Sequence, residues 1–175
     1  VLHGVTAEEL PAALELPARP VLVTARQVAL WRQTARPCEV MIDSGMNRLG
    51  LAPGEASDVL AGMNVAVLHS HLACADNPAH PLNEAQVAAR VPADAYALAN
   101  SAGICLGPAY HLDLVRPGIG LFGGGLMPDG RVSRTVARMQ ARIISLRDVP
   151  AGGSVGYAAA FVAARPSRIA TVALG

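Results

Sequence analysis

The sequence contains no lysine. All 14 basic residues are arginines, and 13 acidic residues leave a net charge of +1. Because arginine, aspartate and glutamate are interspersed along the chain, no extended patch of one sign is predicted. Nucleic-acid binders and anionic-membrane binders need such a patch, so the composition argues against both classes. The glycine-rich residues 123–130 also lack the lysine and the following helix of a phosphate-binding loop, which favours a linker.

Long hydrophobic runs are missing as well, although 52% of the residues are apolar. Residues 59–75 and 96–109 are the most apolar, but polar residues and proline keep both below the ~18 consecutive apolar residues of a membrane span. The cysteines, Cys38, Cys74 and Cys105, are odd in number and have neither CxxC nor metal-ligand spacing. They are predicted to be reduced, buried thiols of a cytoplasmic protein, and no metal site is expected.

Short apolar runs alternate with helical patterns as far as about residue 132. Runs that are apolar on both faces and separated by amphipathic helices indicate βαβ units and a parallel sheet. The expected strands are residues 1–4, 20–24, 39–43, 65–71, 95–100 and 112–116. The expected helices are residues 26–36, 54–63 and 83–91, with an irregular or briefly helical stretch at 102–110.

Beyond that point the alternation stops. Residues 135–149, 154–162 and 168–174 are strand-like, and no helical pattern lies between them. The sequence therefore predicts an α/β region over residues 1–134 and the beginning of a β domain over residues 135–175. Both termini fall in strand-like runs, so we expect a segment of a longer protein.

Polar side chains follow the predicted strands at their carboxyl ends, where the loops of a parallel sheet converge. The intervals from Asp43 to His71 and from His71 to Asn100 are each close to thirty residues, about one βα repeat. Two guanidiniums, an imidazole and a hydroxyl suit an anionic ligand better than a metal. The set is Asp43 with Arg48, His71, Asn100 with Ser101, and Arg116.

Each of these residues also has a purely structural interpretation. His71 can be a hydrogen-bonded structural histidine. Arg48 can pair with Asp43 across the loop, and Ser101 can cap the helical turn that follows it. The residue types alone leave these alternatives open.

Four motifs in this sequence resemble those of the alanine racemase family. A fifth segment, residues 168–175, is similar to the lead-in to the family's Gly-Tyr-Ala-Asp-Gly. All five stand in family order at family spacing and together cover essentially the whole chain. The four motifs are Met41-Ile-Asp43-Ser-Gly45-Met-Asn-Arg48-Leu-Gly50, His71-Leu-Ala-Cys-Ala-Asp76 with the later Asn83-Glu-Ala-Gln86, Leu98-Ala-Asn100-Ser101-Ala-Gly103, and Val115-Arg116-Pro-Gly118-Ile119.

The resemblance implies a two-domain isomerase that uses pyridoxal 5'-phosphate to interconvert L-alanine and D-alanine for the supply of peptidoglycan precursors. Its fold would be an α/β, (β/α)8 TIM-type barrel followed by a C-terminal β domain, and it would act as a head-to-tail homodimer. In this chain, residues 1–134 would form part of the barrel and residues 135–175 the start of the β domain.

The resemblance implies that the two later motifs bind the cofactor phosphate. Asn100 and Ser101, together with the backbone of Gly118 and Ile119, would hold it. An amide and a hydroxyl at a helix amino terminus suit an anion, so this role is compatible with Ser101 as a cap.

The resemblance also implies that three other residues contact the cofactor ring. Arg116 would face the pyridine nitrogen, His71 would pack against the ring and support Arg116, and Arg48 would lie by the ring hydroxyl and the substrate carboxylate. An arginine keeps its proton, leaves the ring nitrogen unprotonated and weakens the ring as an electron sink.

Met41 is a departure from the family pattern. It stands where many family members have a lysine, often carbamylated, that orients the arginine matched by Arg48. We expect Asp43, an anion or a water network to replace it.

Racemisation needs an acid/base group on each face of the substrate α-carbon. The family uses a lysine, which also forms the Schiff base, and a tyrosine from the partner subunit. The resemblance places the lysine upstream of Val1 and the tyrosine directly after Gly175. No catalytic residue is therefore expected within these 175 residues, which alone are predicted to be inactive.

Three other interpretations remain open. A non-catalytic pyridoxal-phosphate-binding barrel protein would lack the β domain, so residues 135–174 count against it. A racemase of serine or another small amino acid would share all five segments. A plain α/β domain with structural polar residues would make the ordered motifs a coincidence.

Overall fold

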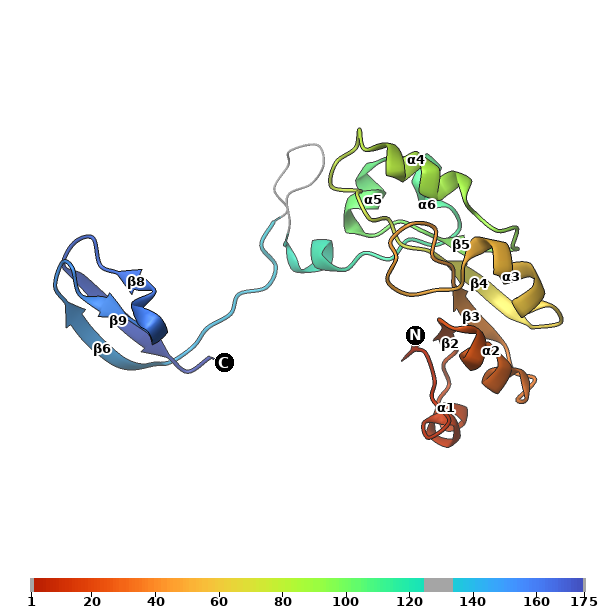
Figure 1. The fold of residues 1–175 in the computed structure, drawn as a ribbon, viewed down its shortest axis with the longest axis horizontal. Coiled ribbons are helices and arrows are strands. Elements are labelled where there is room, and N and C mark those ends of the chain that lie inside the picture. The colour runs from red at the N-terminus through yellow and green to blue at the C-terminus, as the bar shows by residue number, and fades with distance from the viewer. Residues whose placement is uncertain (1, 125–133, 175) are drawn as a thin grey trace. The chain divides into compact units, whose positions relative to one another are not determined.

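The computed structural model describes residues 2–124 and 134–174. The chain divides into two compact units, Val1–Val136 and Ala137–Gly175, which are described separately. The first unit is built on a five-stranded sheet whose strands are all parallel and follow the order of the chain (Figure 1). The strands are β1 (Leu2–His3), β2 (Pro20–Leu22), β3 (Cys38–Met41), β4 (Val65–His69) and β5 (Tyr96–Ala97).

Short helices connect successive strands, as parallel pairing requires. Thr24 caps α2, because its hydroxyl accepts the amide hydrogen of Gln27 at 3.2 Å. Proline stands in the first turn of both α3 and α4, where a missing amide hydrogen costs nothing. The helices are α1 (Leu10–Glu15), α2 (Ala25–Arg32), α3 (Pro53–Leu60), α4 (Pro81–Ala88), α5 (Ser101–Cys105), α6 (Pro108–His111) and the 3-10 helix η1 (Ile119–Phe122).

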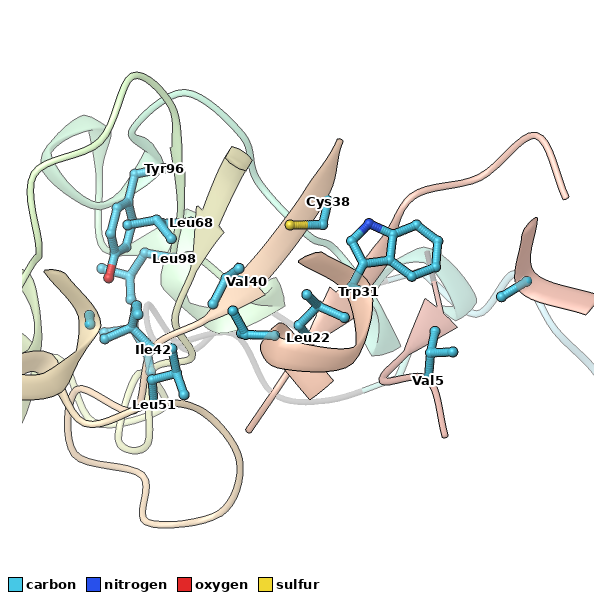
Figure 2. Packing of buried hydrophobic residues seen from close by; sticks show 14 of the residues in the cluster. Val5, Leu22, Trp31, Cys38, Val40, Ile42, Leu51, Leu68, Tyr96 and Leu98 are labelled. Atoms are coloured by element: carbon cyan, nitrogen blue, oxygen red, sulfur yellow. The ribbon is translucent and has the colours of Figure 1, made fainter. Parts of the chain in front are cut away.

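The main core lies between these helices and one face of the sheet. It includes Leu22 of β2, Val40 of β3 and Leu68 of β4, together with Trp31 of α2 (Figure 2). Trp31 is among the largest fully buried side chains, and its indole Nε1 donates to the carbonyl oxygen of Arg36 at 3.1 Å. Burial of this apolar face fixes the sheet against its helices.

The opposite face of the sheet, called the inner face below, has a second cluster made of Val21, Val23 and Met41. Side chains alternate between the faces of a strand, so Glu39 shares the inner face with Met41, and His69 lies on it because Leu68 faces the helices. Both ionisable residues are buried, with 4% of Glu39 and 2% of His69 exposed. A buried polar or charged side chain needs a hydrogen-bond partner, and both residues have one.

In the first unit, five of the six predicted strands and all three predicted helices are present, but residues 112–116 are not a strand. Within the described residues they form an isolated bridge between Ala97 and Leu114 and a few backbone hydrogen bonds to residues 96–99, but no continuous ladder. Two local features interrupt pairing: Leu112 has a φ of 51°, and the Asp113 carboxylate accepts the amide hydrogen of Tyr96 at 2.9 Å. Helix α1, which was not predicted, adds Ala13 to the core. The predicted linker, residues 123–130, lies mostly outside the described residues.

The three cysteines are free, but they are not all buried as predicted. Cys38 is buried in the core, Cys74 is half-buried, and Cys105 is exposed at the last residue of α5. Burial raises the pKa of the Cys38 thiol to about 11, with a smaller contribution from neighbouring Glu39. Cys38 is therefore an uncharged core residue at neutral pH.

The second unit is antiparallel. Strand β6 (Ile143–Val149) pairs with β9 (Ser167–Val172), and β7 (Ser154–Val155) pairs with β8 (Phe161–Val162). A 3-10 helix, η2 (Tyr157–Ala159), lies between β7 and β8. The predicted run at residues 135–149 becomes a strand only from Ile143. Across the described ranges of both units, no helix is long and apolar enough to cross a lipid bilayer.

Candidate functional site

The loop after β3 is closed by one carboxylate. Asp43 accepts the amide hydrogens of Gly45 at 3.0 Å, Asn47 at 2.9 Å and Arg48 at 2.9 Å. The chain then returns to β3, where Leu51 donates to the Met41 carbonyl at 2.9 Å and accepts from the Asp43 amide at 2.9 Å. Asp43 thus supports Arg48 through the backbone of the loop and not through the side-chain ion pair considered above.

These contacts make a prediction about acid stability. Burial raises the pKa of Asp43, but hydrogen bonds from the amides of Asn47, Gly45 and Arg48 outweigh it and leave the pKa below its ordinary value. The carboxylate therefore stabilises the fold at neutral pH, and this contribution is lost as pH falls below about 4 through the lowered pKa. Asp43→Asn is expected to cost about 1–2 kcal/mol at pH 7, a range that allows for partial exposure.

Urea unfolding of the whole protein at pH 7 and pH 3 measures this contribution. The stability difference between wild type and Asp43→Asn should shrink at the lower pH, whereas exposed Asp58→Asn in α3 should change little at either pH. A difference that persists undiminished at pH 3 contradicts the role given to the carboxylate.

The loop after β4 is held by α4. The fully buried Gln86 donates to the carbonyl of His71 at 2.8 Å and accepts from the amide of Ala73 at 2.9 Å. Asn83, one turn earlier, donates to the carbonyl of Asn77 at 2.9 Å. The paired amides of the Asn-x-x-Gln motif therefore fix the backbone that presents His71.

His71 lies between two of the other predicted residues. Its Nε2 is 3.4 Å from Asn100 Nδ2, and its Nδ1 is 3.4 Å from Arg116 Nη2. Arg48 and His71 also line one small cavity, together with Asp43 and Ser70. The structure thus brings His71, Asn100, Arg116 and Arg48 to the same edge of the sheet, at the carboxyl ends of its strands.

Asn100 and Ser101 divide two tasks at the start of α5. Asn100 is the cap, since its Oδ1 accepts the Gly103 amide hydrogen at 2.8 Å, so the alternative interpretation of Ser101 as the cap is wrong. Instead the Ser101 hydroxyl oxygen accepts from the amides of Gly118 at 2.9 Å and Gly120 at 3.1 Å. Ser101 and the backbone at residues 118–120 are therefore gathered at one point, beside exposed Ile119.

Arg116 reaches across the sheet from beyond β5. Its amide donates to the carbonyl of Ala99 at 2.9 Å, and its guanidinium donates to the carbonyl of Ser70 and lies 3.3 Å from His69 Nδ1. Burial lowers the pKa of Arg116, and the nearby Tyr96 and Glu39 oppose that shift. The guanidinium stays charged, because arginine begins from a very high pKa.

Two residues of this network were missed from the sequence. His69 Nε2 lies 2.7 Å from Glu39 Oε2, and Glu39 Oε1 accepts from Arg19 Nη2 at 2.9 Å and from Arg19 Nε at 3.0 Å. A signal was available, because a glutamate inside the apolar run of β3 must find a partner if the strand is buried. Its identity depends on tertiary pairing and could not be seen in the sequence.

The assembled residues favour an anionic ligand that also carries a hydrogen-bond acceptor for the Arg116 guanidinium. A hydroxyl and neighbouring amides lie at one end, and a guanidinium with an imidazole lies at the other. Within residues 2–124 and 134–174, no group of three or more His, Cys, Asp or Glu side chains is placed to hold a metal ion. The arrangement suits a small anionic molecule such as a phosphate ester.

Comparison with known proteins identifies the family. Residues 1–125 match the alanine racemase N-terminal domain, and residues 136–175 match the alanine racemase C-terminal domain. The alanine racemase of Rhizobium meliloti is 40% identical over 89% of this chain and 46% of its own length. The catabolic alanine racemase of Agrobacterium fabrum is 40% identical over the whole chain and 50% of its own length.

Solved structures agree. Alanine racemase from Bartonella henselae, solved with covalently bound pyridoxal phosphate, has a TM-score of 0.73 at 28% identity, covering 100% of this chain and 54% of that one. The biosynthetic alanine racemase of Pseudomonas aeruginosa has a TM-score of 0.65 at 33% identity, covering 98% and 60%. This chain spans about half the length of the curated relatives it matches. The chain belongs to the alanine racemase family.

Proposed function

We propose that the protein containing this chain is an alanine racemase that binds pyridoxal 5'-phosphate and interconverts L-alanine and D-alanine, the latter a precursor of peptidoglycan. The observation that supports this most is the convergence of Arg116, His71 and the Ser101–Gly118–Gly120 cluster at one edge of a parallel sheet. Family membership supports the same reaction. The antiparallel strands from Ile143 to Val172 count against a barrel protein without a β domain.

The donor set fits the cofactor. The Ser101 hydroxyl, which the amides of Gly118 and Gly120 hold in place, would bind the phosphate together with the backbone of Gly118 and Ile119, and Asn100 would keep the start of α5 in place. Arg116 would donate to the pyridine nitrogen, and His71 would lie against the ring. When bound, the cofactor supplies the electron sink that makes the substrate α-proton removable.

Two arginines of this chain would then bind the substrate and the cofactor ring without transferring a proton themselves. Arg48, on the loop closed by Asp43, would bind the substrate carboxylate as a fixed guanidinium. Arg116 would keep its proton throughout, so the ring nitrogen remains a hydrogen-bond acceptor. These roles concern binding and orientation, and none of these residues exchanges the α-proton.

The two proton-transfer groups are proposed to lie outside these 175 residues. The sequence contains no lysine, so it offers no side-chain amine for covalent attachment of the cofactor. The 175-residue polypeptide mixed with pyridoxal phosphate and borohydride should acquire no cofactor adduct except at its terminal amine, and should form no D-alanine. Peptide mass spectrometry and a coupled D-alanine assay measure both. An adduct on an internal residue contradicts the proposal.

The whole protein tests the reaction itself. Purified protein with pyridoxal phosphate should convert L-alanine to D-alanine and the reverse, followed by chiral chromatography. L-Serine run in parallel measures substrate preference, and faster turnover of serine would contradict alanine as the substrate.

We also propose that the whole protein is a homodimer, which sedimentation velocity would measure. We propose a cytoplasmic location as well, which the three free cysteines support.

Ser101 gives a separate prediction. Ser101→Ala removes the hydroxyl that gathers the Gly118 and Gly120 amides, and is expected to weaken cofactor binding about tenfold, the loss of one hydrogen bond to a charged group. Fluorescence titration of the apoprotein with pyridoxal phosphate measures the effect. Ser57→Ala, at an exposed position of α3, is the control and should leave binding unchanged. Equal affinity in both variants contradicts the phosphate role.

A further inference from the structure

We infer that Glu39 and His69 are positioning residues that hold Arg116 in a single orientation through a buried hydrogen-bonded chain. This rests on the proposed function, because the group positioned is the arginine that would face the cofactor ring. The chain runs from Glu39 Oε2 to His69 Nε2 at 2.7 Å and from His69 Nδ1 to Arg116 Nη1 at 3.3 Å. It crosses the inner face from β3 through β4 to the segment after β5.

The short contact with Glu39 selects the histidine tautomer. A carboxylate 2.7 Å from Nε2 accepts a hydrogen bond, so Nε2 carries the proton. Nδ1 then presents its lone pair to the Arg116 guanidinium, which can only donate. A doubly protonated His69 would place an N–H against an N–H. Glu39 therefore makes His69 an acceptor for Arg116.

Burial makes this choice strict. The side chains of Glu39 and His69 are 5% and 2% exposed, so water has little access to either and cannot replace their protein partners. Arg19 occupies the remaining oxygen of Glu39, at the end of the chain away from Arg116. Both oxygens of Glu39 and both ring nitrogens of His69 thus have polar neighbours, and in a buried network of this kind the loss of one contact weakens the next.

Strand β5 leaves space for Arg116 to reach His69. The arginine starts beyond β5, where its amide binds Ala99, yet its guanidinium contacts His69 on β4. Tyr96 and Leu98 belong to the core on the helix side, so Ala97 and Ala99 face the inner side. Alanines at both positions keep the path over β5 open.

Two substitutions of His69 separate its two contacts. His69→Asn can present an amide oxygen where Nδ1 lies, which keeps an acceptor for Arg116. His69→Gln places its amide where Nε2 lies, which keeps the contact with Glu39 and removes the acceptor. We expect apoprotein of the glutamine variant to bind pyridoxal phosphate about tenfold more weakly than that of the asparagine variant, the loss of one charged hydrogen bond. Equal affinities would overturn the inference.

A second measurement does not require the cofactor. Nitrogen-15 NMR of imidazole-labelled apoprotein should show His69 as the neutral tautomer protonated at Nε2, and Glu39→Gln should disturb that signal while exposed Glu84→Gln leaves it intact. A doubly protonated His69, or one protonated at Nδ1, would overturn the inference. If the whole protein fails to racemise alanine while the NMR result holds, the proposed function fails and the positioning chain stands.

Discussion

Arg116→Leu is expected to lower kcat/KM for alanine racemisation in the whole protein by about 10²–10³, the effect of removing one preorganised donor from a reaction site. The substitution also leaves the Ser70 carbonyl and His69 Nδ1 without the guanidinium they contact. Arg116→Lys should recover only part of the loss, because an ammonium keeps the charge but cannot contact Ser70, His69 and His71 with one planar fork.

Steady-state kinetics in both directions measure the effect, and cofactor content must be determined for each variant so that lost binding is separated from slower turnover. Arg26→Leu, at an exposed position of α2, is the matched control and should stay within about twofold of wild type. If Arg116→Leu behaves like this control, Arg116 does not face the reacting molecule.

Gly50→Ala is expected to destabilise the protein by about 2–4 kcal/mol and to reduce activity by displacing Arg48. Gly50 has a φ of 129°, a conformation that residues with a Cβ rarely adopt. An added Cβ would also lie 2.6 Å from the Asp43 amide nitrogen and 2.8 Å from the Ile42 carbonyl carbon. Both atoms belong to the backbone of the two residues that follow β3, so the loop must move.

Gly54→Ala provides the control for this prediction. Gly54 lies in α3, with no atom within 4 Å of an added Cβ, so alanine there should stabilise the helix by about 0.5–1 kcal/mol. Thermal unfolding of the two variants should therefore move Tm in opposite directions. Unchanged stability in Gly50→Ala would mean that the return of the loop to β3 is not as tight as described.

Hydrophobic periodicity was enough to predict most of the fold. The alternation of buried strands with helices predicted the parallel sheet, and the part of a (β/α)8 TIM-type barrel that the family resemblance implied is confirmed by the family and its solved structures. Residues 112–116 were wrong as a strand because the pattern contains no sign that the Asp113 side chain takes the Tyr96 amide. Helix α1 was missed, although Leu10, Ala13 and Leu14 have helical spacing.

The site was predictable where each residue stands next to a strand end, and not where it depends on pairing between strands. His71, Asn100 and Arg116 could be placed together from repeat length and motif, and the structure brings them together. Glu39 and His69 lie within strands, thirty residues apart, and only the register of β3 against β4 makes them partners. Their roles, like those of the predicted residues, stay predictions until the variants are measured.

The order of the parallel sheet has a consequence for how the chain acquires its structure. Each strand pairs with the strand made just before it, so partners are 18 residues apart, as in Leu2 and Pro20, or 28, as in Leu68 and Tyr96. Such short separations keep the loop-closure entropy of each step small, and the sheet can grow strand by strand as the chain emerges during synthesis. Arg116 contacts a histidine 47 residues earlier, a larger separation than that between these strand partners. We therefore expect the proposed cofactor site to be among the last parts of this unit to form, after the sheet that supports it is in place.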